Sequence, residues 1–194
     1  MKRKGFVKWL LCGVGIACAA AGILTGWKLY RNSRIPEETG EDGGVSYRSE
    51  GTDAPKKIGS AEITAFSCVF STFAFEESEG LGNRVYELNA SVHGDGVQGS
   101  FCSRSRDGEE ETYTFVSDSS FMTRLQEIAA EYDFAAHNGF WHTVNGLPDM
   151  YGAGLDIQYA SGETVSAYDN QDCFLPPDAM RELVVLFSPG AEEF

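Results

Sequence analysis

The hydrophobic and polar positions divide the chain into three stretches of different pattern. Residues 9–27 carry no charged side chain and are almost wholly apolar. Residues 35–60 are rich in glycine and acidic side chains and have few apolar positions. From residue 61 onward, short segments alternate apolar with polar residues, and two segments space their apolar residues three or four apart. We therefore predict a membrane anchor over 1–34, a flexible acidic linker over 35–60 and a folded domain over 61–190.

Alternating positions predict strands in the domain, because successive side chains of a strand point to opposite faces. In the first such segment Phe66, Cys68 and Phe70 alternate with small or polar residues. Between two later segments, the Asp107-Gly108 pair predicts a tight two-residue turn with both residues at positive φ. The predicted strands cover residues 61–75, 84–92, 97–104, 112–116 and 140–144, followed by a hairpin over 155–168.

The register of this last hairpin depends on the length of its loop. A two-residue Ser161-Gly162 turn sets Ile157 opposite Ser166, whereas a three-residue loop over 160–162 sets Ile157 opposite Val165. The second register keeps the apolar residues on one face of the sheet, so we predict it. It also places the glycine at the left-handed position that a three-residue loop requires.

Two further segments have the apolar spacing of amphipathic helices. Asp118 or Ser119 can cap the first, and the second begins near Pro176. Strands, a helix, more strands and a last helix follow one another with hairpin-like links, which predicts an α+β domain. We expect an antiparallel sheet of about six to seven strands with two helices packed on one face. The apolar faces comprise Phe121, Leu125, Ile128 and Tyr132 in the first helix, and Met180, Leu183, Val184 and Phe187 in the second.

The apolar run 9–27 predicts a single transmembrane helix, because its length as a helix is roughly 28 Å, close to the thickness of the hydrocarbon core. Trp9 and Trp27 close its ends at the depth that indole rings favour. Four basic residues precede it and three follow it, which favours a cytoplasmic N-terminus and an external domain. Two alternatives remain: cleavage of a signal peptide near Ala21, or a lipoprotein processed at Cys18.

Charge is distributed very unevenly along the chain. The first 34 residues hold seven Lys and Arg and no acid, whereas the rest holds eight basic and 29 acidic residues. A domain of this charge repels phosphate, so nucleic acid is excluded as a partner. We expect the partners to be the membrane, through residues 9–27, and a protein or another neutral or cationic ligand.

Metal and cofactor chemistry finds little support in the sequence. The three histidines show no recognised ligand spacing, and neither a phosphate-binding glycine loop nor a calcium-loop spacing is present. Cys68, Cys102 and Cys173 are the cysteines of the domain, so it can hold at most one internal disulfide. We predict no metal, no cofactor and no catalytic residue.

A loop-rich stretch before the last hairpin is the best candidate for a ligand surface. It gathers aromatic, amide and acidic side chains, and loops on rigid scaffolds often carry function. Packing of the loop onto the core is the competing interpretation. The candidate residues are Trp141, His142, Asn145, Asp149 and Tyr151, with Tyr168, Asp169 and Asn170 expected nearby across the sheet edge.

Three hypotheses about function follow. The first is a membrane-tethered, non-enzymatic domain that binds a ligand or partner outside the membrane. The second is an external hydrolase-like enzyme in which His142 acts with Asp149 or Tyr151. The third is an accessory subunit of a membrane complex, which requires an exposed apolar patch. The sequence favours the first.

The last third of the chain resembles uncharacterised, N-terminally membrane-anchored proteins of Gram-positive bacteria. The resemblance rests on the pattern L-x-I-x-Y-x-S-G-E from residue 155, on Asp169-Asn170, and on a proline-started helix that ends in Leu186-Phe187. It implies a bacterial surface location and no particular activity.

Overall fold

The computed structural model of the protein describes residues 38–39, 45–50, 53–73, 81–144 and 152–188. The described residues belong to one compact unit, Glu37–Phe194. None of the helices among them is long and apolar enough to cross a membrane. The predicted transmembrane helix lies outside the described residues and stays a prediction.

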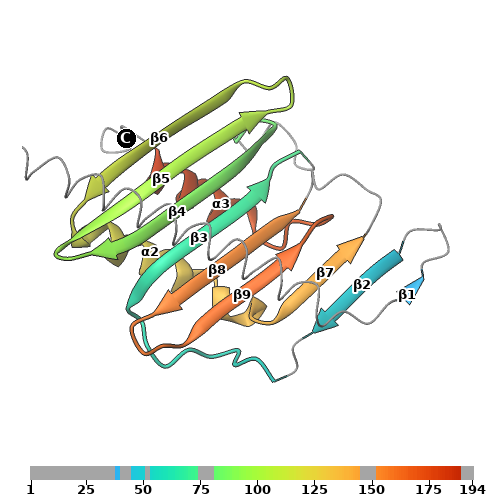
Figure 1. Ribbon diagram of the computed structural model, residues 1–194, viewed down its shortest axis with the longest axis horizontal. Helices are drawn as coiled ribbons and strands as arrows, with labels where there is room; N and C mark the ends of the chain where they lie inside the picture. Colours follow the sequence, from blue (N-terminus) through green and yellow to red (C-terminus); the bar gives the residue numbers. More distant parts are fainter. Residues whose placement is uncertain (1–37, 40–44, 51–52, 74–80, 145–151, 189–194) are drawn as a thin grey trace, which may run out of the picture. The chain divides into compact units, whose positions relative to one another are not determined.

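The strands among the described residues form one sheet of nine, in the order β1-β2-β7-β9-β8-β3-β4-β5-β6 (Figure 1). All neighbouring strands are antiparallel except β7 and β9. The strands are β1 (Glu38–Thr39), β2 (Val45–Glu50), β3 (Ile63–Ser71), β4 (Arg84–His93), β5 (Gly96–Ser105), β6 (Glu110–Ser117), β7 (Phe140–Val144), β8 (Ala153–Tyr159) and β9 (Thr164–Asp169).

The predicted α+β class is confirmed, and the seven strands from β3 to β9 match the predicted strand segments. The expectation of a purely antiparallel sheet is corrected at one position, because β7 pairs in parallel with β9. The reason is topological. The hairpin of β8 and β9 turns back so that β9, and not β8, lies next to β7.

The segment 35–60, expected to be a flexible linker, contributes two strands to the sheet. β2 pairs with β7 over five residue pairs. Further along, the Glu163 carboxylate accepts hydrogen bonds from the amides of Gly59 and Ser60, at 2.9 and 3.2 Å. The Asn138 side chain also donates to the carbonyl of Pro55, at 2.9 Å. The described part of this segment is therefore attached to the domain.

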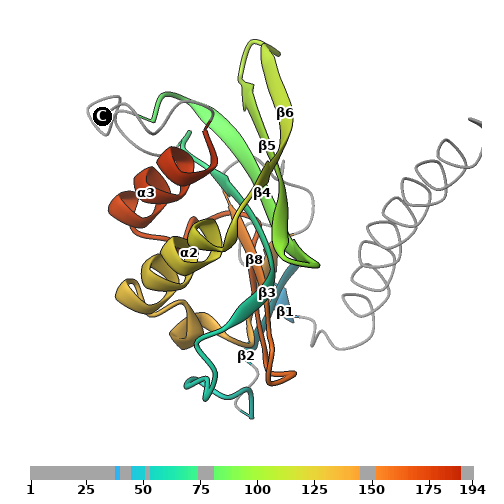
Figure 2. The same cartoon turned by 90° about the vertical axis from the view of Figure 1, so that its left-hand side faces the viewer.

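Both helices lie on one face of the sheet, as predicted (Figure 2). They are α2 (Ser119–Glu131) and α3 (Pro177–Phe187), and a short 3₁₀ helix, η2 (Phe134–His137), follows α2. Asp118 caps α2 by accepting from the Ser120 amide at 2.8 Å. We call the covered side of the sheet the helix face and the opposite side the distal face. The helix face holds the core, whose largest fully buried side chains include Phe70, Leu88, Leu125, Leu155, Met180 and Leu183.

The two hairpins with predicted turns gave different outcomes. In β8–β9, Ile157 pairs with Val165 and Gly162 has φ of 85°, so the predicted three-residue loop is confirmed. In β5–β6, the predicted two-residue Asp107-Gly108 turn is wrong. The loop has three residues, and only its last, Gly108, has positive φ, at 87°. A three-residue loop needs a left-handed conformation only at its final position, which the glycine supplies.

Candidate functional site

Parallel pairing of β7 with β9 brings together the five predicted ligand residues that the structure describes. Trp141 is paired with Tyr168, and His142 with Asp169. Asn170 follows at the end of β9. The other three candidates, Asn145, Asp149 and Tyr151, lie outside the described residues.

These residues do not form one surface, because neighbours along a strand point to opposite faces. Asp169 shares its face with the buried Ala167 and Val165, so it and its partner His142 lie on the helix face. Trp141 and Tyr168 lie on the distal face, with their ring centroids 5.7 Å apart. The predicted ligand surface is thus divided by the sheet.

On the helix face, the carboxylate of Asp169 makes several hydrogen bonds at the end of β9. Its two oxygens lie 3.1 Å from Nδ1 of His142. One oxygen also accepts the amides of Gln171 and Asp172, at 2.8 and 3.0 Å. Asp169 is only 4% exposed. A carboxylate engaged in this way holds a turn and a histidine ring in place, which is a structural role.

Asn170 also acts on the backbone. Its side-chain oxygen accepts the amide of Val144 at 2.8 Å, and its amide group donates to the carbonyl of Val144 at 3.0 Å. The side chain thus makes the two hydrogen bonds that the backbone of a paired strand residue would make to Val144. It thereby extends the contact between β7 and β9 by one residue. The role of this buried side-chain amide is therefore structural.

The cysteines of the domain are free thiols. Cys68 on β3 and Cys102 on β5 are separated by β4, to which both strands are paired. Burial raises the pKa of Cys68 well above its ordinary value and that of Cys173 to about 11. Both thiols therefore stay protonated at neutral pH, which makes them poor nucleophiles.

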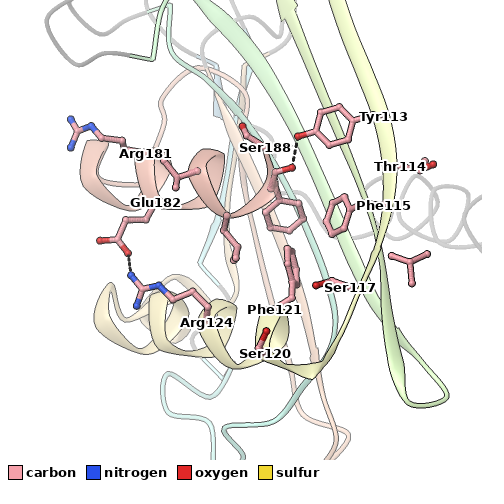
Figure 3. A pocket seen from close by; sticks show the side chains of 14 residues that line it. Tyr113, Thr114, Phe115, Ser117, Ser120, Phe121, Arg124, Arg181, Glu182 and Ser188 are labelled. Carbon is pink, nitrogen blue, oxygen red and sulfur yellow. Dashed lines mark hydrogen bonds and ion pairs between the residues drawn. The ribbon is translucent and has the colours of Figure 1, made fainter. Parts of the chain in front are cut away.

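A groove between β6, α2 and α3 is the second candidate site (Figure 3). Its volume is about 830 Å³. Three phenylalanines form its apolar wall, with the ring centroid of Phe121 lying 5.1 Å from that of Phe115 and 5.0 Å from that of Phe187. Val185 and Leu186 of α3 continue this apolar lining.

The wall of the groove is held by close packing and by one partly buried hydroxyl group. The ring of Phe115 lies over Gly99 of β5, where an added Cβ would come within 2.2 Å of it. The Tyr113 hydroxyl donates to the carbonyl of Phe187, which joins β6 to the end of α3. Burial raises the pKa of Tyr113 to about 12, so the hydroxyl remains a donor. These contacts fix the shape of the groove.

The polar rim of the groove connects the two helices. Arg124 of α2 lies 2.6 Å from the carboxylate of Glu182 on α3 and 2.8 Å from that of Glu127. The hydroxyl of Tyr132 donates to the other oxygen of Glu182 at 3.0 Å. Arg181, the second arginine that lines the groove, lies 2.5 Å from the carboxylate of Asp178. Because both arginines are matched by carboxylates, the rim does not offer a net positive site to an acidic ligand.

Strand β6 borders the groove as an edge of the sheet. Among the strands that the structure describes it pairs only with β5, so the backbone N–H and C=O groups of its other side have no partner in a described strand. Val116 on this strand is 79% exposed. The sequence predicted the strand but not its position at the edge of the sheet. Alternation of apolar and polar residues locates a strand and does not tell which strands become its neighbours.

Within the described ranges, no group of three or more His, Cys, Asp or Glu side chains is placed to hold a metal ion. Comparison with known proteins gives no match to a family model, a curated protein or a solved structure.

Proposed function

We propose that this chain is a membrane-tethered, non-enzymatic binding domain that takes an extended segment of a partner protein into the groove beside β6. The single observation that carries the proposal is an apolar groove bordered by β6, whose outer edge pairs with no other strand in the described part of the chain. An extended segment can add to such an edge through main-chain hydrogen bonds and place alternate side chains in the adjacent hollow.

The chemistry of the groove defines the segment. Tyr113 and Phe115 lie on the helix face of β6, so partner side chains that point the same way must be apolar. Exposed Glu109, Glu110 and Glu111 lie at the start of β6 and favour basic side chains at that end of the partner. The acidic balance of the chain, 29 acidic against 15 basic residues, acts in the same direction.

The membrane part of the proposal rests on the sequence. The apolar run 9–27 and its basic flanks support an anchor with the domain on the outside, on the surface of a bacterium. A domain held there and joined to a partner segment would also suit an accessory subunit of a membrane complex.

Site-specific photo-crosslinking in native membranes tests this function. A benzoylphenylalanine replaces Val185 in the groove or, as a matched control, Val69 on the distal face. These valines are 49% and 40% exposed, so both can accept the larger side chain. We expect a protein adduct from position 185 and not from position 69, mapping to an extended apolar and basic segment of another protein.

A synthetic peptide of the mapped segment then gives a quantitative test. Val185→Arg places a charge in the groove and should weaken peptide binding at least tenfold, on the order of 1.4 kcal/mol or more. Val69→Arg should leave binding unchanged. Equal labelling at the two positions, no adduct, or an adduct only with a second copy of the chain would contradict the proposal.

A further inference from the structure

The connection from β2 to β3 is attached to the domain at two places. Its described part, residues 53–60, passes the turn of the β8–β9 hairpin (Figure 1), and we call these residues the strap. Near the end of the strap, the carboxylate of Glu163 accepts the two amides of residues 59–60. Near its start, Lys56 donates from Nζ to the backbone carbonyl of Asn138.

Asn138 is the centre of this second attachment and is buried, with 5% exposure. Its side-chain amide donates to the carbonyls of Pro55 and Thr164, at 2.9 and 3.0 Å. Its side-chain oxygen accepts the amide of Ser166 at 2.9 Å. One residue thus joins the strap to β9, and the bond from Lys56 brings a positive charge of the strap to the end of η2.

His137, the last residue of η2, directly precedes Asn138 in the chain. Its ring packs on that of Phe174, with the ring centroids 5.0 Å apart. The charged groups that influence this ring are Asp133, just before η2, and Lys56 of the strap. The two β9 residues bonded to Asn138 carry no charge.

A proton on this ring is disfavoured while the strap is in place. Burial is the largest influence and lowers the pKa of His137 below the usual 6.5, Asp133 raises it, and Lys56 lowers it again. When the strap moves away, Lys56 leaves and water reaches the ring, so the pKa of His137 rises toward its ordinary value. Proton binding and departure of the strap therefore favour each other.

We propose that Lys56, Asn138 and His137 form an acid-sensitive clasp, which holds the strap to β9 at neutral pH and releases it when His137 gains a proton. The pKa of His137 is lower with the clasp closed than with it open. The stability of the closed clasp is therefore fully present above pH 6.5 and is lost as the pH falls below that value.

The attachment at the other end of the strap responds differently to acid. Hydrogen bonds from the Ser161 hydroxyl and from the strap amides lower the pKa of Glu163, so its carboxylate keeps its charge at pH 5. Residues 59–60 thus stay bound while the Lys56 end opens. Acid would thereby loosen the hold of the domain on the segment that follows β1 and β2, the strands nearest the predicted membrane anchor.

This device goes beyond the proposed peptide groove. The clasp involves the strap, β9 and η2, whereas β6, α2 and α3 line the groove. Each can therefore be altered by substitution without touching the other, and a failure of one leaves the other standing.

NMR of the full chain in maltoside detergent follows both halves of the clasp. The ring protons of His137 report its pKa, and solvent exchange of the Asn138 side-chain amide reports opening, because that amide donates to Pro55. From pH 7.5 to 5.0 we expect this exchange, corrected for its intrinsic rate, to rise about threefold or more. A corrected rate that stays constant or falls would overturn the clasp.

Two neighbouring lysines test the electrostatic half of the proposal. Lys56→Met removes the charge beside the ring and should raise the pKa of His137 by about 0.3 or more. Lys57→Met is the matched control, since this exposed lysine is not among the groups that influence the ring, and it should leave that pKa unchanged. An unchanged pKa in Lys56→Met, or an equal change in both variants, would contradict the proposal.

Two histidines test the role of the proton. His137→Phe keeps an aromatic ring on Phe174 and cannot gain a proton, so exchange at Asn138 should no longer rise with acid. His93→Gln changes an exposed histidine at the end of β4 and should behave as wild type. Acid-dependent opening that persists in His137→Phe, or disappears in His93→Gln, would show that another group controls the strap.

Discussion

Gly99 shows how one absent side chain shapes the groove. The ring of Phe115 occupies the space where a Cβ would stand, with the nearest ring carbon only 2.2 Å away. Because this contact is far below van der Waals distance, any larger residue forces the ring to move. Phe115 packs in turn on Phe121 and Phe187, so the displacement would spread along the apolar wall.

Gly99→Ala is therefore expected to destabilise the fold by about 1–3 kcal/mol, the usual cost of overpacking. Gly154→Ala is the matched control, since its new Cβ would lie 3.4 Å from the Tyr168 ring, a contact that a small shift relieves. Denaturant unfolding of both variants measures the difference. An equal effect of the two would show that flexibility of glycine, and not the ring above it, sets the cost.

Asp156 predicts a pH dependence of stability. Burial raises its pKa from 3.8 to about 6 in the folded state, against the Ser166 hydrogen bond that lowers it, so folding favours its protonated form. The stability that this group contributes is present below pH 4 and is lost as the pH rises through 6.

Asp156→Asn removes the ionisation and keeps an oxygen that can accept from Ser166. The free energy of unfolding of the variant should therefore exceed that of wild type by about 1–3 kcal/mol at pH 7.5, with the gain shrinking toward pH 4. Urea unfolding at several pH values checks this. A difference that does not change with pH would assign it to causes other than ionisation.

At the scale of elements, the side chain of Asn170 reinforces the short contact between β7 and β9. Only two residue pairs join these strands in parallel, and the amide of Asn170 adds two hydrogen bonds to Val144 beyond them. Since Asn170 is buried, with 3% exposure, water does not replace those bonds when they are removed.

Asn170→Ala should lower stability by about 1–3 kcal/mol and accelerate hydrogen exchange at the Val144 amide. Asn89→Ala offers a control, because Asn89 is exposed on β4 and makes a longer bond of 3.3 Å to Ser100. That variant should stay within about 0.5 kcal/mol of wild type. Unchanged exchange at Val144 in the first variant would contradict the role of the amide.

Local patterns predicted the elements well and their arrangement poorly. Alternation located the seven strands from β3 to β9, and the apolar face of the last hairpin fixed its register. Neither signal tells which strands become neighbours. The sequence therefore could not predict the parallel pair, or that β6 lies at the edge of the described sheet. β2 was missed because the glycines and acids around it outweighed a short alternation of only six residues.

The candidate site could have been predicted more fully than it was. Adjacency in sequence grouped Trp141 with His142, although alternation along a strand already places them on opposite faces. What the sequence could not supply is the order of strands, which brings β7 next to β9.

At the scale of the whole molecule, the main prediction is that residues 1–34 are retained in the mature protein as a membrane anchor. A retained anchor predicts an intact mass equal to that of the full chain when the protein is purified from membranes. Cleavage near Ala21 would instead remove about 2 kDa, and processing at Cys18 would leave a lipid on the new N-terminus. Mass spectrometry of the native protein distinguishes these three outcomes.

The position of β2 has a mechanical consequence. If residues 1–34 anchor the chain as proposed, a pulling force from the membrane would reach the folded domain first at β1 and β2. These strands precede the core strands in the chain and lie at one end of the strand order. Force applied there would detach β2 from β7 while β3 and the helix-covered core stay folded. In single-molecule stretching from the N-terminal side we expect a small, reversible first extension before the main rupture. Under tension the pairing of β2 with β7 would thus break first, and it would form again when the force is removed.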